Sequence, residues 1–224
     1  MANEIDALLA CASQHLTRLK SNQPEGEPRC WQRSYPAKAL ILAAQDLRNL
    51  RHFPNLGCET PITGGSEHDV WYFNGDIRVF KATNHGGFGL KPGRPGSEYN
   101  FEVATALDYL RRLLLINKHF EDDIRVEGVW LASDEAVPRI VTSQRFITKA
   151  REMRPEEISD SMKGAGFIQP PMGEKHGIWT KQSEEGIVVI GDVFSKNVIL
   201  EEKSGIMVIV DAVARLIRDG ENEE

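Results

Sequence analysis

The sequence predicts an α+β protein with two lobes. Its strand-like segments come in neighbouring pairs, and helical segments separate these pairs instead of alternating with single strands. That order fits neither a βαβ sheet nor an all-β protein. The chain has 224 residues, of which 41% are hydrophobic and 27% are charged. It is therefore long and apolar enough to bury a core in one large domain or in two lobes.

The composition excludes several classes of protein. The formal net charge of −6 gives no basic footprint, so we expect no nucleic-acid partner. No apolar run reaches the roughly 18–20 residues that cross a bilayer, and the N-terminus lacks the basic and apolar regions of a secretory signal, so no membrane partner is expected. The cysteines are Cys11, Cys30 and Cys58, without CxxC spacing. We therefore expect a reduced, cytoplasmic protein with neither a disulfide framework nor a zinc site.

Two helices are expected near the N-terminus. Residues 4–20 place their apolar side chains on one helical face. The second helix is expected over residues 36–50, with Pro36 in its first turn, where proline is favoured. From about residue 60 the sequence changes to strands and turns. Residues 1–55 are therefore predicted to be an N-terminal helical extension.

The middle of the chain is expected to contain two hairpins with a long helix between them. The first hairpin pairs strands 69–73 and 77–81 through an Asn-Gly turn. A loop rich in glycine and proline over residues 84–98 and a helix over 102–119 come next. The second hairpin joins IRVEGVWLA to RIVTSQRFI.

The last part of the chain is expected to place acidic groups beside buried strands. A short helix over residues 154–167 begins with Pro155 and has acids in its first turn. The loop GDVFSKN follows the apolar segment EGIVVI, and it holds Asp192 and Asn197 five positions apart. Asp211 is expected to end the next strand, IMVIVD.

Several residues lie in the order that nucleotide and metal chemistry requires. Phosphates need close backbone approach and a fixed cation, a divalent metal needs oxygen ligands, and an accepting hydroxyl needs an acid that orients it. The sequence supplies glycines in a first turn, a strand lysine, a glutamate at a helix start, a late acid and amide, and a final acid: Gly64, Gly65, Lys81, Glu102, Asp192, Asn197 and Asp211.

This order resembles the protein-kinase signature. The sequence is closest to the small kinase domain found in polyvalent proteins of phages and conjugative elements. The segments that carry this likeness are ATALDYLRRLLLIN, DDIRVEG, PRIVTSQRFI and the helix from EEI to GF, together with the late D-x-x-x-x-N-V and its following aspartate. The likeness covers residues 60–217 or so.

The resemblance implies a minimal two-lobed protein-kinase-like fold that uses ATP and Mg²⁺. Its N-lobe would span about 56–145 and its reduced C-lobe about 146–224. Gly64, Gly65 and Lys81 would hold the nucleotide phosphates, and Glu102 would position Lys81. Ser143 and Gln144 fall where the backbone would hold the adenine. Asn197 and Asp211 would bind the metal, and Asp192 would orient the acceptor hydroxyl.

Other interpretations of these residues stay open. Asp108 is the rival of Glu102 as the partner of Lys81, although it is placed to pair with Arg112 one helical turn later. Asp192 and Asn197 could be turn residues that bond their own backbone. Asp211 could cap a short helix, VARLIRDG. The histidines His68, His85, His119 and His176 show no ligand spacing and are expected at the surface or in turns.

Two functions follow from these expectations. The first is an ATP- and Mg²⁺-dependent phosphotransferase that phosphorylates a hydroxyl of a protein or a small molecule. The alternative is a catalytically inactive nucleotide-binding or pseudokinase scaffold that binds a partner protein. Residues 193–196 differ from the family loop, and the chain ends within 13 residues of Asp211, so the substrate-binding part is expected to be missing, minimal or replaced.

Overall fold

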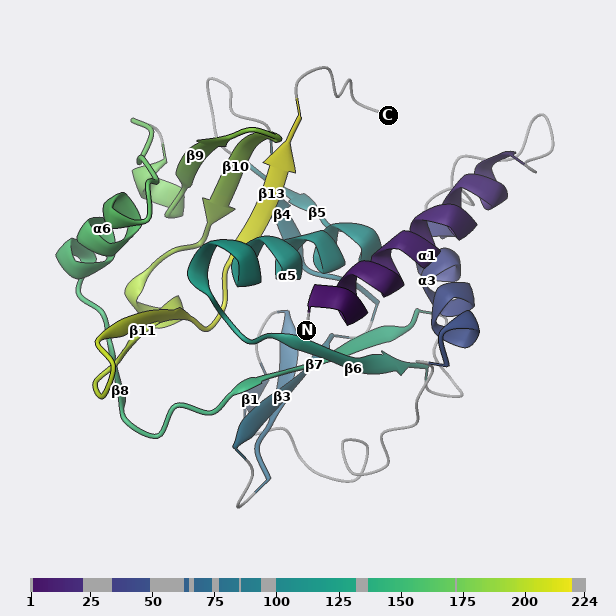
Figure 1. Ribbon diagram of the computed structural model, residues 1–224, viewed down its shortest axis with the longest axis horizontal. Coiled ribbons are helices and arrows are strands. Elements are labelled where there is room, and N and C mark those ends of the chain that lie inside the picture. The colour runs from purple at the N-terminus through teal and green to yellow at the C-terminus, as the bar shows by residue number, and fades with distance from the viewer. Residues whose placement is uncertain are drawn as a thin grey trace. The chain divides into compact units, whose positions relative to one another are not determined.

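The protein has a mixed architecture of helices and antiparallel strands, which confirms the α+β class (Figure 1). The computed structural model describes residues 2–21, 34–48, 63–64, 67–73, 77–84, 86–93, 100–131, 137–171 and 173–218. Its α-helices are α1 (Ala2–Ser21), α3 (Tyr35–Asp46), α5 (Ala106–Phe120) and α6 (Pro155–Gly164). No helix within these ranges is both long enough and apolar enough to span a membrane.

The chain forms two compact units. The first contains residues 1–89, 104–110 and 123–146, and the second contains residues 90–103, 111–122 and 147–224. Helix α5 runs through the boundary, so its first residues belong to the first unit and the others to the second.

A five-stranded antiparallel sheet forms the centre of the first unit. Its order is β1-β2-β3-β7-β6, and its strands are β1 (Thr63–Gly64), β2 (His68–Trp71), β3 (Arg78–Thr83), β6 (Arg125–Trp130) and β7 (Arg139–Arg145). The two expected hairpins are therefore present. Apolar side chains pack against one another in this sheet: Trp71, Ala82, Trp130 and Val141 are buried, and Phe73 and Phe80 pack against them.

The two N-terminal helices of the first unit pack against each other and against β6 (Figure 1). Both begin close to the expected residues, and Pro36 lies in the first turn of α3. The fully buried faces consist of small and aliphatic side chains: Ile5, Leu8, Ala12, Ala39, Leu40, Ala43 and Ala44. Their burial joins the two helices in one apolar core.

Helix α5 begins four residues later than the sequence predicted. Thr105 and Asp108 form a reciprocal cap, in which the Thr105 backbone N–H donates to Asp108 Oδ2 at 2.9 Å and the Asp108 N–H donates to Thr105 Oγ1 at 3.2 Å. This capping box fixes the helix start after Thr105. The prediction that Glu102 begins the helix is therefore wrong: Glu102 lies in strand β5 (Phe101–Val103).

The second unit contains three small antiparallel sheets. Their orders are β13-β10-β9, β12-β11-β8 and β4-β5. The strands are β4 (Leu90–Pro92), β5, β8 (Ala150–Glu152), β9 (Trp179–Ser183), β10 (Gly186–Gly191), β11 (Val198–Glu201), β12 (Ile206–Ile209) and β13 (Val213–Ile217). Short 3₁₀ turns occur at Glu174–His176 and Ser195–Asn197. Strand β10 lies in the middle of its sheet and is buried over most of its length.

Three further expectations are corrected in the described parts of the chain. The expected loop over 84–98 contains strand β4, which pairs with β5. The short helix considered after Asp211 as an alternative is not formed, because this segment is strand β13 and pairs with the buried strand β10 along its whole length. His68 lies buried in β2 instead of at the surface, and its Nε2 is 2.9 Å from the Tyr109 hydroxyl. His85, the Asn-Gly turn of the first hairpin and Gly65 lie outside the described residues.

Candidate active site

The loop that holds Asp192 begins where β10 ends against a tightly packed glycine. A Cβ atom at Gly191 would lie 2.8 Å from Ile178 Cδ1 and 2.9 Å from Phe101 Cε1, which leaves no room for a side chain. The next residue, Asp192, has a φ of 61°. Aspartate tolerates this left-handed conformation better than most residues, yet the conformation still costs free energy. A strained residue of this kind is held in place by its surroundings.

The segment just before β9 anchors this loop. The Asp192 N–H donates to the carbonyl of His176 at 3.1 Å, and the Val193 N–H donates to that of Gly177 at 3.2 Å. Gly177 has a φ of 57°, and a Cβ atom there would lie 2.7 Å from the Val193 nitrogen. Glycine therefore meets both needs at this position, the left-handed backbone and the close approach of the loop.

The Asn197 side chain links the two ends of the loop through hydrogen bonds to Asp192. Its amide Nδ2 donates to the Asp192 carbonyl and to Asp192 Oδ2, both at 2.8 Å. Asn197 is 8% exposed, so these bonds form away from bulk water. Because the amide nitrogen is turned toward Asp192, Oδ1 is the atom with which Asn197 can bind a cation.

The Asp192 carboxyl is shifted toward its protonated form. Burial raises its pKa, Lys196 and the hydrogen bond from Asn197 oppose the rise, and the neighbouring Asp211 adds to it. The ammonium of Lys196 is 3.9 Å from Asp192 Oδ1 and its side chain is 70% exposed, so water screens its effect. A carboxyl with a raised pKa and a fixed orientation has the properties of a group that exchanges a proton.

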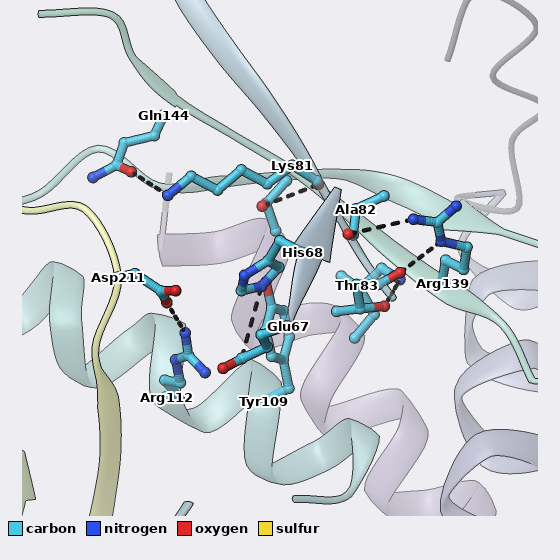
Figure 2. A network of polar contacts seen from close by, with 12 residues as sticks. Glu67, His68, Lys81, Ala82, Thr83, Tyr109, Arg112, Arg139, Gln144 and Asp211 are labelled. Atoms are coloured by element: carbon cyan, nitrogen blue, oxygen red, sulfur yellow. Dashed lines mark hydrogen bonds and ion pairs between the residues drawn. The ribbon is translucent and has the colours of Figure 1, made fainter. Parts of the chain in front are cut away.

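Asp211 contacts the backbone of Asn197. It also pairs with a buried arginine, as Figure 2 shows. The Asn197 carbonyl accepts hydrogen bonds from the backbone N–H groups of Val210 at 2.9 Å and of Asp211 at 3.4 Å. Nη2 of Arg112, on α5, donates to Asp211 Oδ1 at 2.9 Å. Asp211 lies after the end of β12, in the connection to β13. The second unit thus brings Asp192, Asn197 and Asp211 together.

Arg112 is a residue of this site that the sequence argument missed. The sequence considered Arg112 only as an i,i+4 partner of Asp108, whereas its Nη2 donates to Asp211; the Asp108 carboxylate accepts hydrogen bonds from Thr105 at the helix start. The Arg112 side chain is only 7% exposed. The available signal was weak, because Arg112 directly follows Arg111 in a helix that contains both apolar and charged residues.

Lys81 contacts a polar side chain of the neighbouring strand in the first unit. Its Nζ donates to Gln144 Oε1 at 3.1 Å (Figure 2). Lys81 lies in β3 opposite Thr142 of β7, and Gln144 is 6% exposed. Gly64 ends the short strand β1, which pairs with β2. A lysine that lies along a sheet with its ammonium on an amide oxygen can hold an anionic group.

Ser143 takes part in a different network from Lys81. Its hydroxyl donates to Glu127 Oε1 at 2.5 Å and accepts from Arg78 Nε at 2.7 Å. Arg78 also donates to the Ser143 carbonyl at 3.0 Å and to Asp123 Oδ2 at 2.5 Å. Because β7 lies between β3 and β6, Ser143 is an internal residue of the sheet. The expected adenine-binding role of Ser143 and Gln144 stays a prediction.

Glu102 has basic partners within the second unit. Its Oε2 is 3.4 Å from Arg215 Nη1 and 3.9 Å from Lys91 Nζ. These contacts follow from the sheet pairings, because Lys91 lies opposite Glu102 in the β4-β5 ladder. The Glu102 side chain is 43% exposed, and ion pairs of this kind contribute little to stability.

Comparison of the chain with known protein families gives a match. Residues 49–218 match the family described as the serine/threonine/tyrosine kinase found in polyvalent proteins. The chain belongs to this kinase family. The resemblance inferred from the sequence is thereby confirmed. Neither a search of curated proteins nor a search of solved structures found a match.

Membership of a kinase family suggests which ligands the carboxylate and amide oxygens around Asp192 could bind. Kinases in general use a nucleotide and a divalent metal, and the metal is held by carboxylate and amide oxygens. Asp192, Asn197 and Asp211 present this set of donors. The family match covers all three residues and also Lys81, Ser143 and Gln144.

Proposed function

We propose that this kinase is an ATP- and Mg²⁺-dependent phosphotransferase that phosphorylates a hydroxyl group of a protein or of a small molecule. The observation that carries the proposal is the Asn197 side chain, which donates hydrogen bonds to both the carbonyl and the carboxylate of Asp192 within the loop between the buried strand β10 and strand β11. In a simple turn, one hydrogen bond from the Asn197 amide to the Asp192 carbonyl would satisfy the backbone. Here the Asn197 amide also donates to the Asp192 carboxylate and so orients it.

Asp192 is the group that orients the acceptor hydroxyl in this proposal. Its left-handed backbone and its bond from Asn197 fix the carboxylate, which lowers the cost of aligning the hydroxyl. Its raised pKa brings its proton affinity nearer to that of a catalytic base at neutral pH. Asp192 therefore accepts the hydroxyl proton as the phosphoryl group is transferred.

Asn197 and Asp211 are the proposed metal ligands. Mg²⁺ prefers oxygen donors and keeps several of its waters, so one amide oxygen and one carboxylate suffice on the protein side. Arg112 pairs with Oδ1 of Asp211, and a carboxylate presents two oxygens. Metal binding at Asp211 therefore does not require that this pair break.

The first unit supplies the proposed nucleotide contacts. Lys81 would hold the phosphates, with Gln144 fixing its ammonium. Gly64 and Gly65 would approach the phosphates, and the strand of Ser143 and Gln144 would bind the adenine.

Residues 56–145 and 146–224 would form the two lobes, and residues 1–55 would form the helical extension. The proposed partner of Lys81 is Glu102, or Asp108 in its place; the bonds of Asp108 to Thr105 favour a structural role for Asp108.

Nucleotide binding and phosphoryl transfer are tested in two steps. Thermal unfolding is first measured with ATP, with MgCl₂ and with both. A ligand at about 100 times its dissociation constant stabilises the native state by roughly 2.7 kcal/mol. Transfer from labelled ATP is then compared between the wild type and Asp192→Asn. We expect the variant to keep nucleotide binding and to lose at least about 100-fold in transfer rate.

Two exposed residues of helix α6 provide matched controls. Asp160→Asn removes a carboxylate and Lys163→Met removes an ammonium, both from exposed positions. We expect Lys81→Met to abolish most of the stabilisation by ATP, and Asp211→Asn to abolish its dependence on Mg²⁺, while the controls retain both. If no nucleotide stabilises the wild type, the proposal is wrong.

The pairing of Asp211 with Arg112 favours a second candidate function. A guanidinium already neutralises the carboxylate that would bind the metal, and this arrangement suits an inactive nucleotide-binding scaffold that binds a partner protein. Stabilisation by nucleotide without phosphoryl transfer to any acceptor, and without a change in Asp192→Asn, would select the scaffold over the enzyme.

A further inference from the structure

Three side chains that commonly bind metals meet where α1 and α3 pack together. They are Cys11 and His15 of α1 and Asp46 of α3. Nε2 of His15 lies 2.7 Å from Oδ2 of Asp46, and the Cys11 Sγ lies 3.9 Å from the same oxygen. One ligand atom from each residue lies within 4.8 Å of those of the other two. None of the three residues has a part in the proposed phosphotransferase.

The two helices account for this grouping. Cys11 and His15 are four positions apart on α1, so their side chains lie on the same face of the helix. Asp46 is the last residue of α3. Alanines that are fully buried, Ala12 on α1 and Ala43 on α3, let the helices approach closely. That packing brings a carboxylate from 31 positions away to the imidazole of His15.

The charges around Asp46 favour a cation. The C-terminal end of a helix carries the negative end of its dipole, where a carboxylate is unfavourable and a cation is favourable. Helix α3 has no basic residue in its last turn. A bound cation would offset the unfavourable position of the Asp46 carboxylate at this helix end.

We propose that Cys11, His15 and Asp46 bind a Zn²⁺ ion that joins α1 to α3, with water in the fourth position. Sulfur and imidazole nitrogen suit zinc, whereas Mg²⁺ and Ca²⁺ require a shell of oxygens. In a tetrahedral site with zinc–ligand distances of about 2.0–2.3 Å, the ligand atoms lie about 3.3–3.6 Å apart. The observed separations, 2.7 Å and 3.9 Å, bracket this range, so small side-chain rotations suffice.

This site corrects the expectation of no zinc site. That expectation rests on the cysteines, which lack CxxC spacing. A Cys-x-x-x-His pair on one helical face is a weaker signal than CxxC. It becomes a site only when packing of α1 on α3 adds a third ligand.

Metal binding is tested on the full-length chain after removal of metal with a chelator. Zn²⁺ is titrated by calorimetry, and Co²⁺ is titrated by absorption, where a thiolate ligand gives a sulfur-to-cobalt charge-transfer band. We expect one ion per chain and a higher melting temperature with Zn²⁺. Each of Cys11→Ser, His15→Gln and Asp46→Asn should weaken Zn²⁺ binding by at least about tenfold.

Alkylation of the three cysteines gives a readout within a single sample. Zn²⁺ should slow the alkylation of Cys11 at least tenfold, as followed by mass spectrometry, and leave Cys30 and Cys58 unchanged. Asp6→Asn, an exposed carboxylate on the same helix, and the double variant Cys30→Ser/Cys58→Ser should bind Zn²⁺ as the wild type does. Circular dichroism checks that every variant is folded.

Three results would overturn the proposal. One is Zn²⁺ binding that persists unchanged in folded Cys11→Ser. Another is the absence of a saturable site in the wild type. A Co²⁺ complex without the thiolate band would exclude Cys11 as a ligand and would overturn the three-residue site as well.

Discussion

Arg112 of helix α5 and Asp211, ninety-nine positions later in the chain, form an ion pair at 2.9 Å (Figure 2). The two side chains differ in their exposure to water, because Arg112 is 7% exposed and Asp211 is 40% exposed. Because of this difference, removing one partner should affect stability more than removing the other. Loss of the carboxylate affects a buried charge, whereas loss of the guanidinium leaves a charge that water can solvate.

We therefore predict that Asp211→Asn destabilises the protein more than Arg112→Met. The first change weakens the pairing of a buried guanidinium and should lower the free energy of unfolding by about 2 kcal/mol. The second leaves a partly solvated carboxylate and should cost about 1 kcal/mol or less. Urea unfolding without nucleotide measures both. If Arg112→Met is the more damaging change, packing of the arginine stem matters more than its charge.

The raised pKa of Asp192 predicts a dependence of stability on pH. Its folded-state pKa lies above the unfolded value of about 3.9, so between the two values the folded chain binds more protons. The contribution of this carboxyl to stability therefore falls as pH rises from about 4 through the folded pKa. Asp192→Asn, which cannot ionise, should be as stable as the protonated wild type at pH 4 and more stable at pH 7.

Unfolding of the wild type and Asp192→Asn at a series of pH values tests this prediction. Asparagine also tolerates the left-handed backbone and can accept the bond from Asn197, so the substitution isolates the charge. Asp160→Asn, which removes an exposed carboxylate, is measured beside it as the control. A difference between wild type and Asp192→Asn that stays constant with pH would show that the carboxyl is not shifted in the folded protein.

The cap at Thr105 should contribute more to stability than the ion pairs of Glu102. Thr105→Ala removes the hydroxyl that accepts the Asp108 N–H and should cost about 1 kcal/mol. Thr105→Ser keeps this hydroxyl and should cost less. Glu102→Gln affects a half-exposed ion pair and should cost less than about 0.5 kcal/mol. Thermal unfolding of the three variants checks the order, and a larger cost for Glu102→Gln would contradict the observed helix start.

Arg139 is predicted to be a major contributor to the stability of the first unit. Its side chain is 3% exposed, and its Nε donates to the Thr83 carbonyl at 2.6 Å (Figure 2). Its guanidinium lies 5.2 Å from the centre of the Trp130 ring and 5.9 Å from that of Trp71. Lysine keeps the charge but cannot reproduce the planar contacts.

Arg139→Lys should therefore lower the free energy of unfolding by about 2–3 kcal/mol. The matched control is Arg145→Lys, an exposed position on the same strand, which should change stability by less than about 0.5 kcal/mol. Urea unfolding followed by tryptophan fluorescence measures both, since Trp71 and Trp130 report on this environment. Equal stability of the two variants would show that the guanidinium contacts are not needed.

The order of the main elements could be read from hydrophobic periodicity and turn residues. Periodicity predicted α1 and the hairpins β2-β3 and β6-β7, and Pro155 predicted the start of α6. The helix start at α5 was misplaced because Glu102 looked like a first-turn acid, although the capping box at Thr105 was present in the sequence. The segment after Asp211 was ambiguous, because its short apolar run suits a helix or a strand.

The sequence by itself determined the α+β class, the kinase family, and the local loop in which Asn197 can reach Asp192 over five positions. It did so because periodicity, turn chemistry and short-range spacing are properties of neighbouring residues. Only the tertiary structure decided that Arg112 pairs with Asp211, that β13 is a strand, and that Asp46 meets Cys11 and His15. These contacts join residues distant in the chain, and they depend on which faces become buried together when the elements pack.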